Sequence, residues 1–508
     1  MKKFIQLVVV AIVGTTGNIY AQSGVYAGDA LRFSRTDYGT SSRFKGLGGA
    51  QISLGGDISS IGGNPAGLGM FTRSEFSVTP EFNNIQSKAS FLGQQTKDTK
   101  NQLNLNQAAV VWYNPVVKPK GSDLNKGVLS FVWGIGYNRN NDFYQNTSYQ
   151  GRNTNSSIAD AWAERANGFS TADNQGFIEG DAYNGYLINQ TGGTNGTTYA
   201  PTTSQANNQT QSEVRQGSTS EFNFAGGMNI SNKLYLGASI GFVDVRYTSD
   251  KLYTESGTVA TAIIPGPGDT DIPPAVGQTY NLAYRTYQST SGSGVNARLG
   301  AIYKPTDIIR IGATFQLPTW MHVEDDYAEV LETSYSGGAF FNGNTINSNF
   351  NYNLRTPYKA SLGGSVIIAK NALISADVDY VDYGSTHFSV SDGYSAEIAD
   401  NNAYIKQYYD GTFNYRVGGE YRIQSFSLRA GYGVNGSPYK DDNDNTFQVK
   451  TYSGGIGYRF SSWYVDAAYQ RAETTNTFSP YELNNFSEPV ANVKLARNNV
   501  FLTLGVKF

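Results

Sequence analysis

The feature that most constrains this chain is a period of two in its apolar residues. In residues 307–318, one face of the segment holds Ile309, Ile311, Ala313, Phe315 and Leu317, and the other holds Arg310, Gly312, Thr314 and Gln316. Side chains of a β-strand point to alternate faces, so this pattern, repeated from about residue 219 onwards, predicts strands with one apolar face. The 36 Tyr, 27 Phe and 57 Gly residues favour strands and turns, and only 16% of residues are charged. We therefore expect an all-β fold.

The connections between these segments alternate between two lengths. Short turns lie at residues 231–232, 304–307, 369–372, 422–425 and 459–462, at lengths typical of β-hairpins. Long polar loops lie between them, at roughly 248–292, 319–350, 385–411, 436–448 and 473–497. Short turns at one end and long loops at the other are typical of outer-membrane barrels, whose short turns face the periplasm.

Aromatic residues near the short turns distinguish a membrane barrel from a soluble β-sandwich, in which strands also alternate. Six aromatic residues carry the apolar parity and lie close to a short turn or to the chain end: Tyr303, Tyr421, Phe426, Phe460, Trp463 and Phe508. Interfacial aromatic belts occupy this position, so we favour a transmembrane β-barrel. Fourteen antiparallel strands are expected, at residues 72–82, 105–117, 126–139, 219–230, 233–247, 293–304, 307–318, 351–369, 371–384, 412–422, 425–435, 449–460, 462–472 and 498–508.

The first 21 residues have the form of a secretory signal peptide. Lys2 and Lys3 precede an apolar run, and the small residue Ala21 ends it. We expect cleavage after Ala21 and a place in the outer membrane of a Gram-negative type of cell; a short buried N-terminal strand is the alternative. No other stretch approaches the ~18 continuous apolar residues that a membrane helix needs.

Charge and composition exclude several functions. The formal net charge is −3 and no basic stripe occurs, so a nucleic-acid partner is not expected. The chain has no cysteine, which excludes thiol catalysis and thiolate metal sites. His322 lies near Asp325 and Asp326, and residues 441–445 are acidic, but a solvated loop is the better interpretation of both. No nucleophile-elbow or phosphate-loop motif is present, so we expect that the protein binds no metal and no cofactor and is not an enzyme.

Residues 22–71 do not alternate and have a composition of their own. They hold a glycine-rich stretch at 46–50 and the pair Asn64-Pro65, in which Asn can cap a helix and Pro suits its first position. We expect a compact plug of short helices and turns inside the barrel, with a flexible periplasmic tail as the alternative. The predicted organisation is then a signal peptide at 1–21, a plug at 22–71 and a barrel at 72–508 with a long extracellular loop at about 140–218.

The stretch Gly46-Leu47-Gly48-Gly49-Ala50, then Asp57, then Asn64-Pro65-Ala66-Gly67-Leu68, ahead of a barrel ending in Phe508, resembles the FadL-type outer-membrane transporters of long-chain fatty acids and aromatic hydrocarbons. The resemblance implies a fourteen-stranded barrel, an N-terminal hatch and passive uptake of a hydrophobic small molecule, with lateral exit through a gap in the wall into the outer-membrane lipids. It assigns six residues to the hatch motif: Gly48, Gly49, Ala50, Asn64, Pro65 and Ala66. It also makes Phe508 a signal for the barrel-assembly machinery. FadL-like barrels also act as partners in protein secretion or surface assembly complexes, which is the alternative function.

A ligand with a carboxylate would need an apolar slot and one or two cations. By parity, the candidate cations facing the lumen are Arg298, Arg310, Arg416 and Arg429. Alternatively, these arginines pair across the wall with acids such as Asp377, Asp379, Glu420 or Asp466.

The long loop contains one predicted helix, at 157–169. Ser157 and Asp160 can form a capping box, and Ile158, Ala161, Trp162, Arg165 and Phe169 lie on one side. Trp162 and Phe169 are the candidate residues for a surface groove where a lipid first docks. The alternative is that this stripe packs the loop onto the barrel rim.

Overall fold

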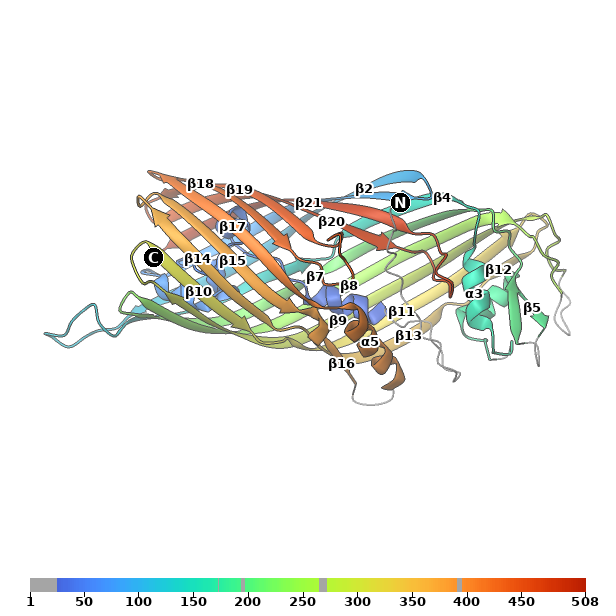
Figure 1. Cartoon of the computed structure of the whole chain (residues 1–508), viewed down its shortest axis with the longest axis horizontal. Helices are drawn as coiled ribbons and strands as arrows, with labels where there is room; N and C mark the ends of the chain where they lie inside the picture. The colour runs from blue at the N-terminus through green and yellow to red at the C-terminus, as the bar shows by residue number, and fades with distance from the viewer. Residues whose placement is uncertain (1–24, 172, 193–196, 265–271, 391–394) are drawn as a thin grey trace.

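The chain forms a closed antiparallel β-barrel with residues of its N-terminal part inside (Figure 1). The computed structural model describes residues 25–171, 173–192, 197–264, 272–390 and 395–508, so the expected signal peptide lies outside the described residues. The first strand, β1 (Glu75–Phe91), pairs with the last, β21 (Ala491–Lys507), and closes the sheet. The prediction of an all-β, 14-stranded antiparallel barrel is confirmed within the described part of the chain.

Four of the fourteen wall positions are built from two consecutive strands, because β3 continues into β4, β10 into β11, β13 into β14 and β15 into β16. Between β1 and β21 the wall strands are β2 (Gln94–Pro115), β3 (Val128–Asp142), β4 (Gln145–Asn153), β7 (Asn207–Ile230), β8 (Leu234–Thr258), β9 (Thr279–Tyr303), β10 (Ile309–Gln316), β11 (Trp320–Tyr335), β13 (Ile346–Arg355), β14 (Lys359–Ile368), β15 (Ala372–Asp382), β16 (His387–Ser389), β17 (Gly411–Ile423), β18 (Phe426–Asn435), β19 (Val449–Phe460) and β20 (Trp463–Phe478). The short strand β12 (Phe340–Asn342) pairs with β11, and β5 (Ile188–Gly192) pairs with β6 (Thr198–Pro201) in a separate sheet.

Several helices accompany the wall. The part of the chain before β1 contains α1 (Val25–Ser34), α2 (Ser42–Gly46) and two 3₁₀ helices, η1 (Ile58–Ile61) and η2 (Pro65–Met70). On the loops are α3 (Ile158–Ala166), α4 (Ile178–Asn184), η4 (Tyr383–Ser385) and α5 (Ser395–Tyr408). No helix in the described ranges is long and apolar enough to cross a membrane.

The predicted short turns lie together at one end of the barrel. At the β7–β8 turn, Ser231 and Asn232 have φ of 57° and 56°, and at the β14–β15 turn Ala369 and Lys370 have φ of 49° and 65°. Two successive left-handed residues form the turn whose twist matches that of paired strands, so these hairpins need no longer connection.

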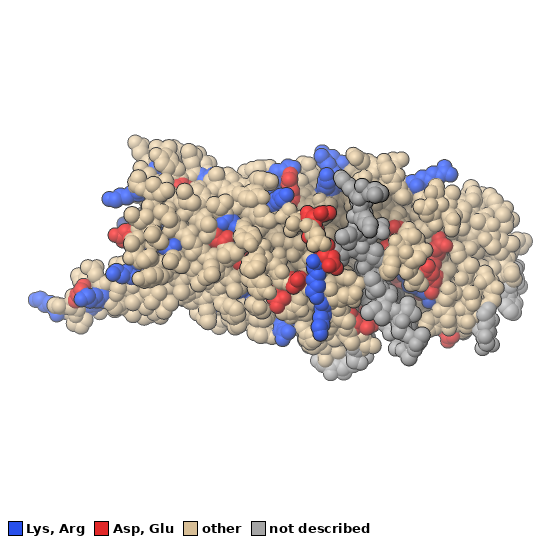
Figure 2. Space-filling view, in the orientation of Figure 1, with Lys and Arg blue, Asp and Glu red and all other residues tan. Residues whose placement is uncertain are grey.

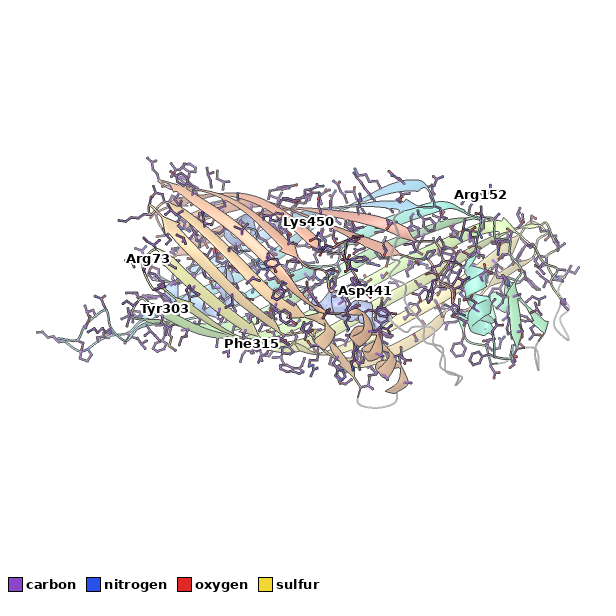
Figure 3. All side chains as sticks on the ribbon, in the orientation of Figure 1. Arg73, Arg152, Tyr303, Phe315, Asp441 and Lys450 are labelled. Atoms are coloured by element: carbon purple, nitrogen blue, oxygen red, sulfur yellow. The ribbon has the colours of Figure 1, made fainter. Side chains whose placement is uncertain are left out.

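The outer face carries the predicted aromatic belt. All six predicted belt residues are exposed on the outside near the short turns, and Figure 3 shows one of them, Tyr303, near that end of the molecule. The other limit of the apolar surface is visible along β8, where Ile240 and Phe242 face outward and are followed by outward-facing Asp244 and Arg246. Figure 2 accordingly shows a largely uncharged wall over β10, β14, β15 and β17 to β19. This surface fits a bilayer.

The strands are longer than the sequence predicts. β8 and β9 each have 25 residues, whereas a strand crosses a bilayer with about 9–11. The expected loop at 248–292 is therefore wrong, since β8 continues to Thr258 and β9 begins at Thr279. The long loop also narrows to 154–206, because β4 and β7 extend into the range expected to be loop. Above the membrane the outward side chains become polar, so apolar and polar residues no longer alternate along the strand, although the backbone hydrogen bonds between strands continue.

The N-terminal segment, which we define as residues 25–71, runs along the lumen. In the half above the membrane, α1 packs in an aromatic cluster with Tyr247 of β8, Tyr352 of β13 and Tyr409 beyond α5. Further down, α2 lies against β19 and β20, and η2 lies against β7, β8 and β9 near their short turns. The predicted helix start at Asn64 is confirmed, since its side chain caps η2 and Pro65 occupies the first position.

The lower part of this segment rests on glycines of the wall. Eight inward-facing glycines meet it, at Gly227, Gly237, Gly300, Gly312, Gly363, Gly418, Gly431 and Gly455. Gly237 lies directly opposite both Gly227 and Gly300 in the sheet, so part of this glycine belt runs across three neighbouring strands. A Cβ added to Gly237 would overlap the backbone of Pro65, and one on Gly418 would overlap Leu47. The absence of side chains here allows the segment to lie directly against the wall backbone.

We expect Gly237→Val to loosen the lower part of the N-terminal segment. The added side chain overlaps η2, and overpacking of this kind costs about 1–3 kcal/mol. Hydrogen exchange of the backbone of residues 64–70 should therefore accelerate. Gly454→Val is the matched control, because its nearest atom, the Arg429 carbonyl oxygen, is 3.8 Å away. Equal exchange in both variants would contradict this account.

Candidate functional site

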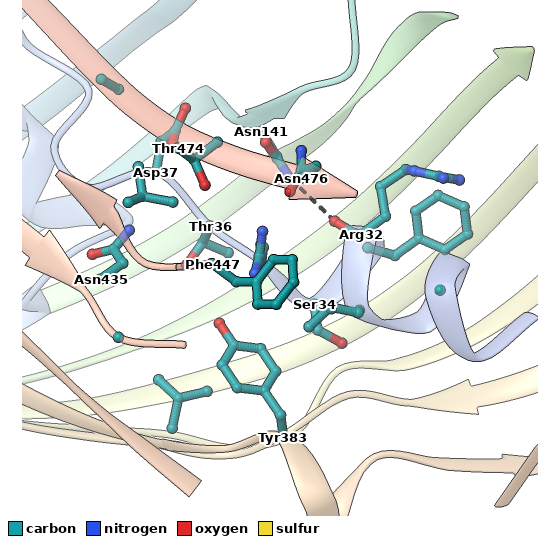
Figure 4. A pocket seen from close by; sticks show the side chains of 18 of the residues that line it. Arg32, Ser34, Thr36, Asp37, Asn141, Tyr383, Asn435, Phe447, Thr474 and Asn476 are labelled. Atoms are coloured by element: carbon teal, nitrogen blue, oxygen red, sulfur yellow. Dashed lines mark hydrogen bonds between the residues drawn. The ribbon is translucent and has the colours of Figure 1, made fainter. Parts of the chain in front are cut away.

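A large cavity lies above the lower part of the N-terminal segment. Its volume is about 1340 Å³, and its lining includes residues 31–38 of the segment, residues 140–142 at the end of β3 and residues 441–447 between β18 and β19 (Figure 4). Figure 3 shows Asp441 of this lining midway along the molecule. The strands β17, β18 and β19 end early on this side, whereas β7 to β9 continue well beyond them (Figure 1). This cavity is our candidate functional site.

Of the four predicted arginines, only Arg416 lines this cavity. Its guanidinium lies 2.6 Å from the carboxylate of Asp379 and 3.7 Å from the ring centre of Tyr38, which belongs to the N-terminal segment. Burial and the Asp379 carboxylate raise the pKa of Tyr38 well above its ordinary value, so this phenol stays neutral. A buried cation already neutralised by a carboxylate and stacked on an aromatic ring is poorly placed to bind a second anion.

The other three arginines lie elsewhere in the lumen. Arg298 forms a two-pronged pair with Glu221 at 2.8 and 2.9 Å. Arg429 donates to Glu420 at 2.7 Å and to Asp466 at 2.6 Å. The expectation that lumenal arginines pair with acids across the wall therefore describes three of the four. Arg310 has no such carboxylate contact among the described residues, and its nearest recorded partner is the sulfur of Met70 at 3.8 Å.

A charged network joins the N-terminal segment to the wall. Arg43 of α2 donates to Glu420 at 3.0 Å, and Glu420 also accepts from Arg429 and Arg422. Burial alone would lower the pKa of Arg43, but the carboxylates of Glu420 and Asp57 raise it above its ordinary value, so the guanidinium remains charged. Charge-assisted bonds in a buried setting hold α2 firmly against β17.

The predicted hatch-motif residues lie within the buried part of this segment. Asn64 accepts a hydrogen bond from the N–H of Ala66 at 3.1 Å and donates to the carbonyl oxygens of Ile52 at 2.6 Å and of Ala301 in β9 at 3.4 Å. Gly48 and Gly49 have φ of 69° and 83°, a region that suits glycine, and Ala50 is fully buried. Asn64 thus ties η2 both to the rest of the segment and to the wall.

One part of the wall lacks a continuous ladder. The β2–β3 ladder begins at the short-turn end and stops at the pair Gln107–Asn138. Beyond it, residues 94–106 of β2 pair with β1 only, while the chain of β3 and β4 pairs with β7. We call the line between residues 94–106 and residues 139–153 the seam; across it the described residues form no backbone pairs.

Side chains bridge the seam instead. The carboxylate of Asp142 accepts from the amides of Asn104 at 2.8 Å and Asn83 at 2.9 Å. Further up, Ser148 of β4 donates through its N–H and its hydroxyl to Asp98 of β2, both at 2.7 Å. Because Asp142 and its neighbours also line the cavity, the cavity reaches the inner side of the seam.

The outer side of the seam begins within the apolar surface. Leu103 of β2 is 71% exposed and lies opposite Phe82, the last outward apolar residue of β1 before the polar Asn84. The lower end of the seam therefore meets the membrane, and the upper end stands above it. Local strand pairing creates this feature, and the sequence contains no signal that could have located it.

Trp162 and Phe169 do not line the cavity. The predicted helix is confirmed as α3 with its capping box of Ser157 and Asp160, but Trp162 is 1% exposed and packs edge-on against Tyr284 of β9. α3 belongs to a loop unit, which we define as residues 154–171, 173–192 and 197–206, whose core it shares with β8, β9 and β11. Most of the predicted apolar stripe thus packs the loop onto the barrel rim.

Sequence reasoning missed Arg43, Tyr38 and Asp142 as functional candidates. Arg43 might have been noticed as a cation next to a glycine-rich stretch expected inside the barrel, whereas Asp142 follows a strand without any motif. No group of three or more metal-ligating side chains occurs among the described residues. In the run at 441–445, Asp442 accepts from the backbone N–H groups of Thr446 and Phe447, which is the role of a turn residue.

Comparison with protein families then identifies the architecture. The family model described as "Outer membrane protein transport protein (OMPP1/FadL/TodX)" matches residues 188–502. The chain belongs to this family. Proteins of the FadL/TodX family are Gram-negative outer-membrane β-barrels, so the chain is an outer-membrane transport protein by family. No curated protein sequence matches it.

Solved structures have the same fold as this FadL/TodX-family chain. The toluene transporter TodX of P. putida is 14% identical, with a TM-score of 0.52 over 93% of this chain and 99% of that one. A FadL homologue of Pseudomonas aeruginosa is 12% identical, with a TM-score of 0.53 over 94% of this chain and 99% of that one. At this identity the likeness establishes the barrel, and the ligand has to be argued from this chain's own residues.

We expect Arg43→Met to release α2 from the wall. A buried hydrogen bond to a charged group contributes about 1.5–3 kcal/mol, so exchange of the backbone of residues 42–46 should accelerate about tenfold to a hundredfold. Arg422→Met is the matched control, because it removes another arginine of Glu420, but one that lies on β17 itself. Hydrogen exchange followed by mass spectrometry measures both, and unchanged exchange in Arg43→Met would show that α2 is held by packing alone.

Proposed function

We propose that this protein is a passive outer-membrane transporter of hydrophobic small molecules, of the long-chain fatty acid or aromatic-hydrocarbon type. The observation that carries the proposal is the cavity of about 1340 Å³, which reaches the seam. A hydrophobic molecule of either type could occupy this cavity and leave towards the bilayer without crossing the lower lumen.

The contents of the lower lumen favour a lateral exit. Residues 42–70 are packed against the glycine belt and are almost all buried, so the direct way to the periplasm is filled. At the seam, by contrast, the described residues form no backbone pairs, and side-chain contacts join the two sides. Breaking the contacts of Asp142 with Asn104 and Asn83 costs far less than parting a ladder of backbone bonds. We infer that the hydrophobic molecule leaves between β2 and β3 into the outer leaflet.

The N-terminal segment acts, in this proposal, as the hatch that separates cavity and periplasm. The lower part of the segment stays in place against the wall. The hatch-motif residues stabilise it: Gly48, Gly49, Ala50, Asn64, Pro65 and Ala66. Residues 35–41 connect α1 to α2, and the first four of them line the cavity, so we infer that gating movements occur there. The protein needs no cofactor and catalyses no reaction in this role.

Export and assembly follow the expected route of a barrel. We propose that the signal peptide at 1–21 directs secretion and that Phe508 is recognised by the barrel-assembly machinery. The Phe508 side chain is exposed at the end of β21, and its N–H donates to the carbonyl oxygen of Ser74 at 3.0 Å, so the terminus is ordered beside β1.

We place the loop unit of α3 on the extracellular side, where it favours a second candidate function, that of a partner in a protein secretion or surface assembly complex. Its core is built around buried Trp162, and Glu255 of β8 accepts from the hydroxyls of Tyr253 and Tyr280 at 2.6 Å. A preorganised surface above the membrane suits a protein partner. Stable co-purification of a secretion component, lost on deletion of residues 158–200, would support this function.

The lateral route is tested by bridging the seam. The chain has no native cysteine, so Asn104→Cys with Asp142→Cys can be joined by a short reducible thiol cross-linker. We expect uptake of labelled toluene or oleate, by cells that carry the protein in their outer membrane, to fall about tenfold on cross-linking because the exit is gated there, and to recover on reduction.

The control pair is Gln86→Cys with Thr99→Cys, which lie opposite each other in the continuous β1–β2 ladder. Cross-linking this pair should leave uptake unchanged. Uptake that persists in the bridged seam variant would refute the lateral route, whereas the absence of uptake in the unlinked protein would refute transport itself.

A further inference from the structure

One connection at the short-turn end of the barrel differs from the rest. β2 ends at Pro115 and β3 begins at Val128, so residues 116–127 join them, whereas the other turns between strands at this end have two to five residues. We call residues 116–127 the finger. Figure 1 shows it projecting along the long axis of the molecule beyond the other turns. Two neighbouring antiparallel strands need no connection of this length, and periplasmic turns of barrels are short.

The finger has a defined conformation. The ammonium group of Lys118 donates to the carbonyl oxygen of Asp123 at 3.0 Å and also to that of Lys126, so it joins the two arms. At the base, the N–H of Gly127 donates to the hydroxyl of Ser231 at 2.9 Å, and the N–H of Ser231 donates to the carbonyl oxygen of Gly127 at 2.9 Å. These bonds hold the finger in shape and fix its base to the β7–β8 turn.

The finger exposes apolar and basic side chains together. Val117 is 94% exposed and Leu124 is 72% exposed. Lys120 and Lys126 are also exposed, and Asp123 is the one acid among the twelve residues of the finger. Figure 2 shows charged side chains on this projection. Apolar residues within a charged surround have the composition of a protein interface, whose core is apolar and whose rim is polar.

The neighbouring turns extend the positive charge of the finger. The carbonyl oxygen of Lys233 in the β7–β8 turn accepts from the N–H of Lys304 in the β9–β10 turn at 2.7 Å, so these turns are adjacent. The whole protein has a net charge of −3, yet this end is basic. Residues 71–74 and the connections at this end hold seven basic residues against two acids: Arg73, Lys118, Lys120, Lys126, Lys233, Lys304 and Lys370 against Asp123 and Asp307. A partner of complementary charge is acidic.

The reach of the finger favours a protein partner over the membrane. An arm of about six extended residues spans roughly 20 Å, whereas the head-group layer is only about 5–8 Å deep on each side of the hydrocarbon core. The tip therefore stands beyond the lipid head groups, on the periplasmic side. An anionic cell-wall polymer would pair with the lysines but would leave Val117 and Leu124 uncovered.

We propose that the finger docks a periplasmic protein whose surface carries carboxylates around an apolar depression. Val117 and Leu124 enter the depression, and Lys120 and Lys126 face the carboxylates. Twelve residues are fewer than the 20–30 or so that each side of a stable interface contributes, so the contact is transient. This interaction goes beyond the proposed transport function and does not depend on it.

Photo-cross-linking of the full chain, in the cells that naturally produce it, tests the proposal. A benzophenone amino acid replaces Ser122, which is exposed on the finger and is not one of the four docking side chains. We expect a discrete protein adduct whose cross-linked peptide, identified by mass spectrometry, carries net negative charge. The same probe in place of the exposed Asn371, in the β14–β15 turn, controls for non-specific capture and should give no such adduct.

Variants of the finger then assign the adduct to its side chains. Lys120→Gln with Lys126→Gln should lower the adduct yield about threefold to tenfold, because each exposed charge pair contributes modestly. Val117→Ser with Leu124→Ser should lower it about tenfold, because the apolar contact is lost. Lys370→Gln, a lysine at the same end but in the β14–β15 turn, is the matched control and should leave the yield unchanged. The amount of folded barrel in the outer membrane is measured for each variant.

Several outcomes would overturn the inference. They are adducts with lipid or cell-wall polymer only, a protein adduct that the finger variants do not weaken, equal capture from position 371, and no adduct at all. None of these outcomes bears on transport, which is measured by uptake.

Discussion

The structure depends on the contact between a chain segment and the bare backbone of the barrel wall. Because eight inward positions of the wall are glycines, residues 42–70 approach the strands more closely than any side chain would allow. The charged pairs of Arg43 and the hydrogen bonds of Asn64 then fix the segment in one orientation. Filling the lower lumen in this way leaves a large cavity above the packed part of the segment.

Side chains alternate along each strand between the outer face and the lumen, so the wall presents a different surface to the bilayer and to the lumen. Outward residues are apolar between two levels, which fit the two surfaces of a bilayer, and inward residues are polar and paired. Several buried charges meet an opposite charge, as Arg298 does with Glu221. At the seam, where the β2–β3 ladder stops, Asp142 bridges the wall beside the cavity.

These features together explain how a barrel with a filled lower lumen can still conduct a molecule. The membership of the FadL/TodX family sets the general activity.

The sequence by itself determined the barrel, its strand number, its short turns and its aromatic belt, because period two, turn residues and outward aromatics are local properties. It also determined the capping of η2 by Asn64 and of α3 by Ser157 for the same reason. Only the tertiary structure decided the length of β8 and β9 above the membrane, the pairing of Arg416 with Asp379, the burial of Trp162 and the position of the seam. Each of these depends on which strands and segments become neighbours, and residues such as Asp142 and Asn104, 38 positions apart in the chain, reveal no such contact until the barrel closes.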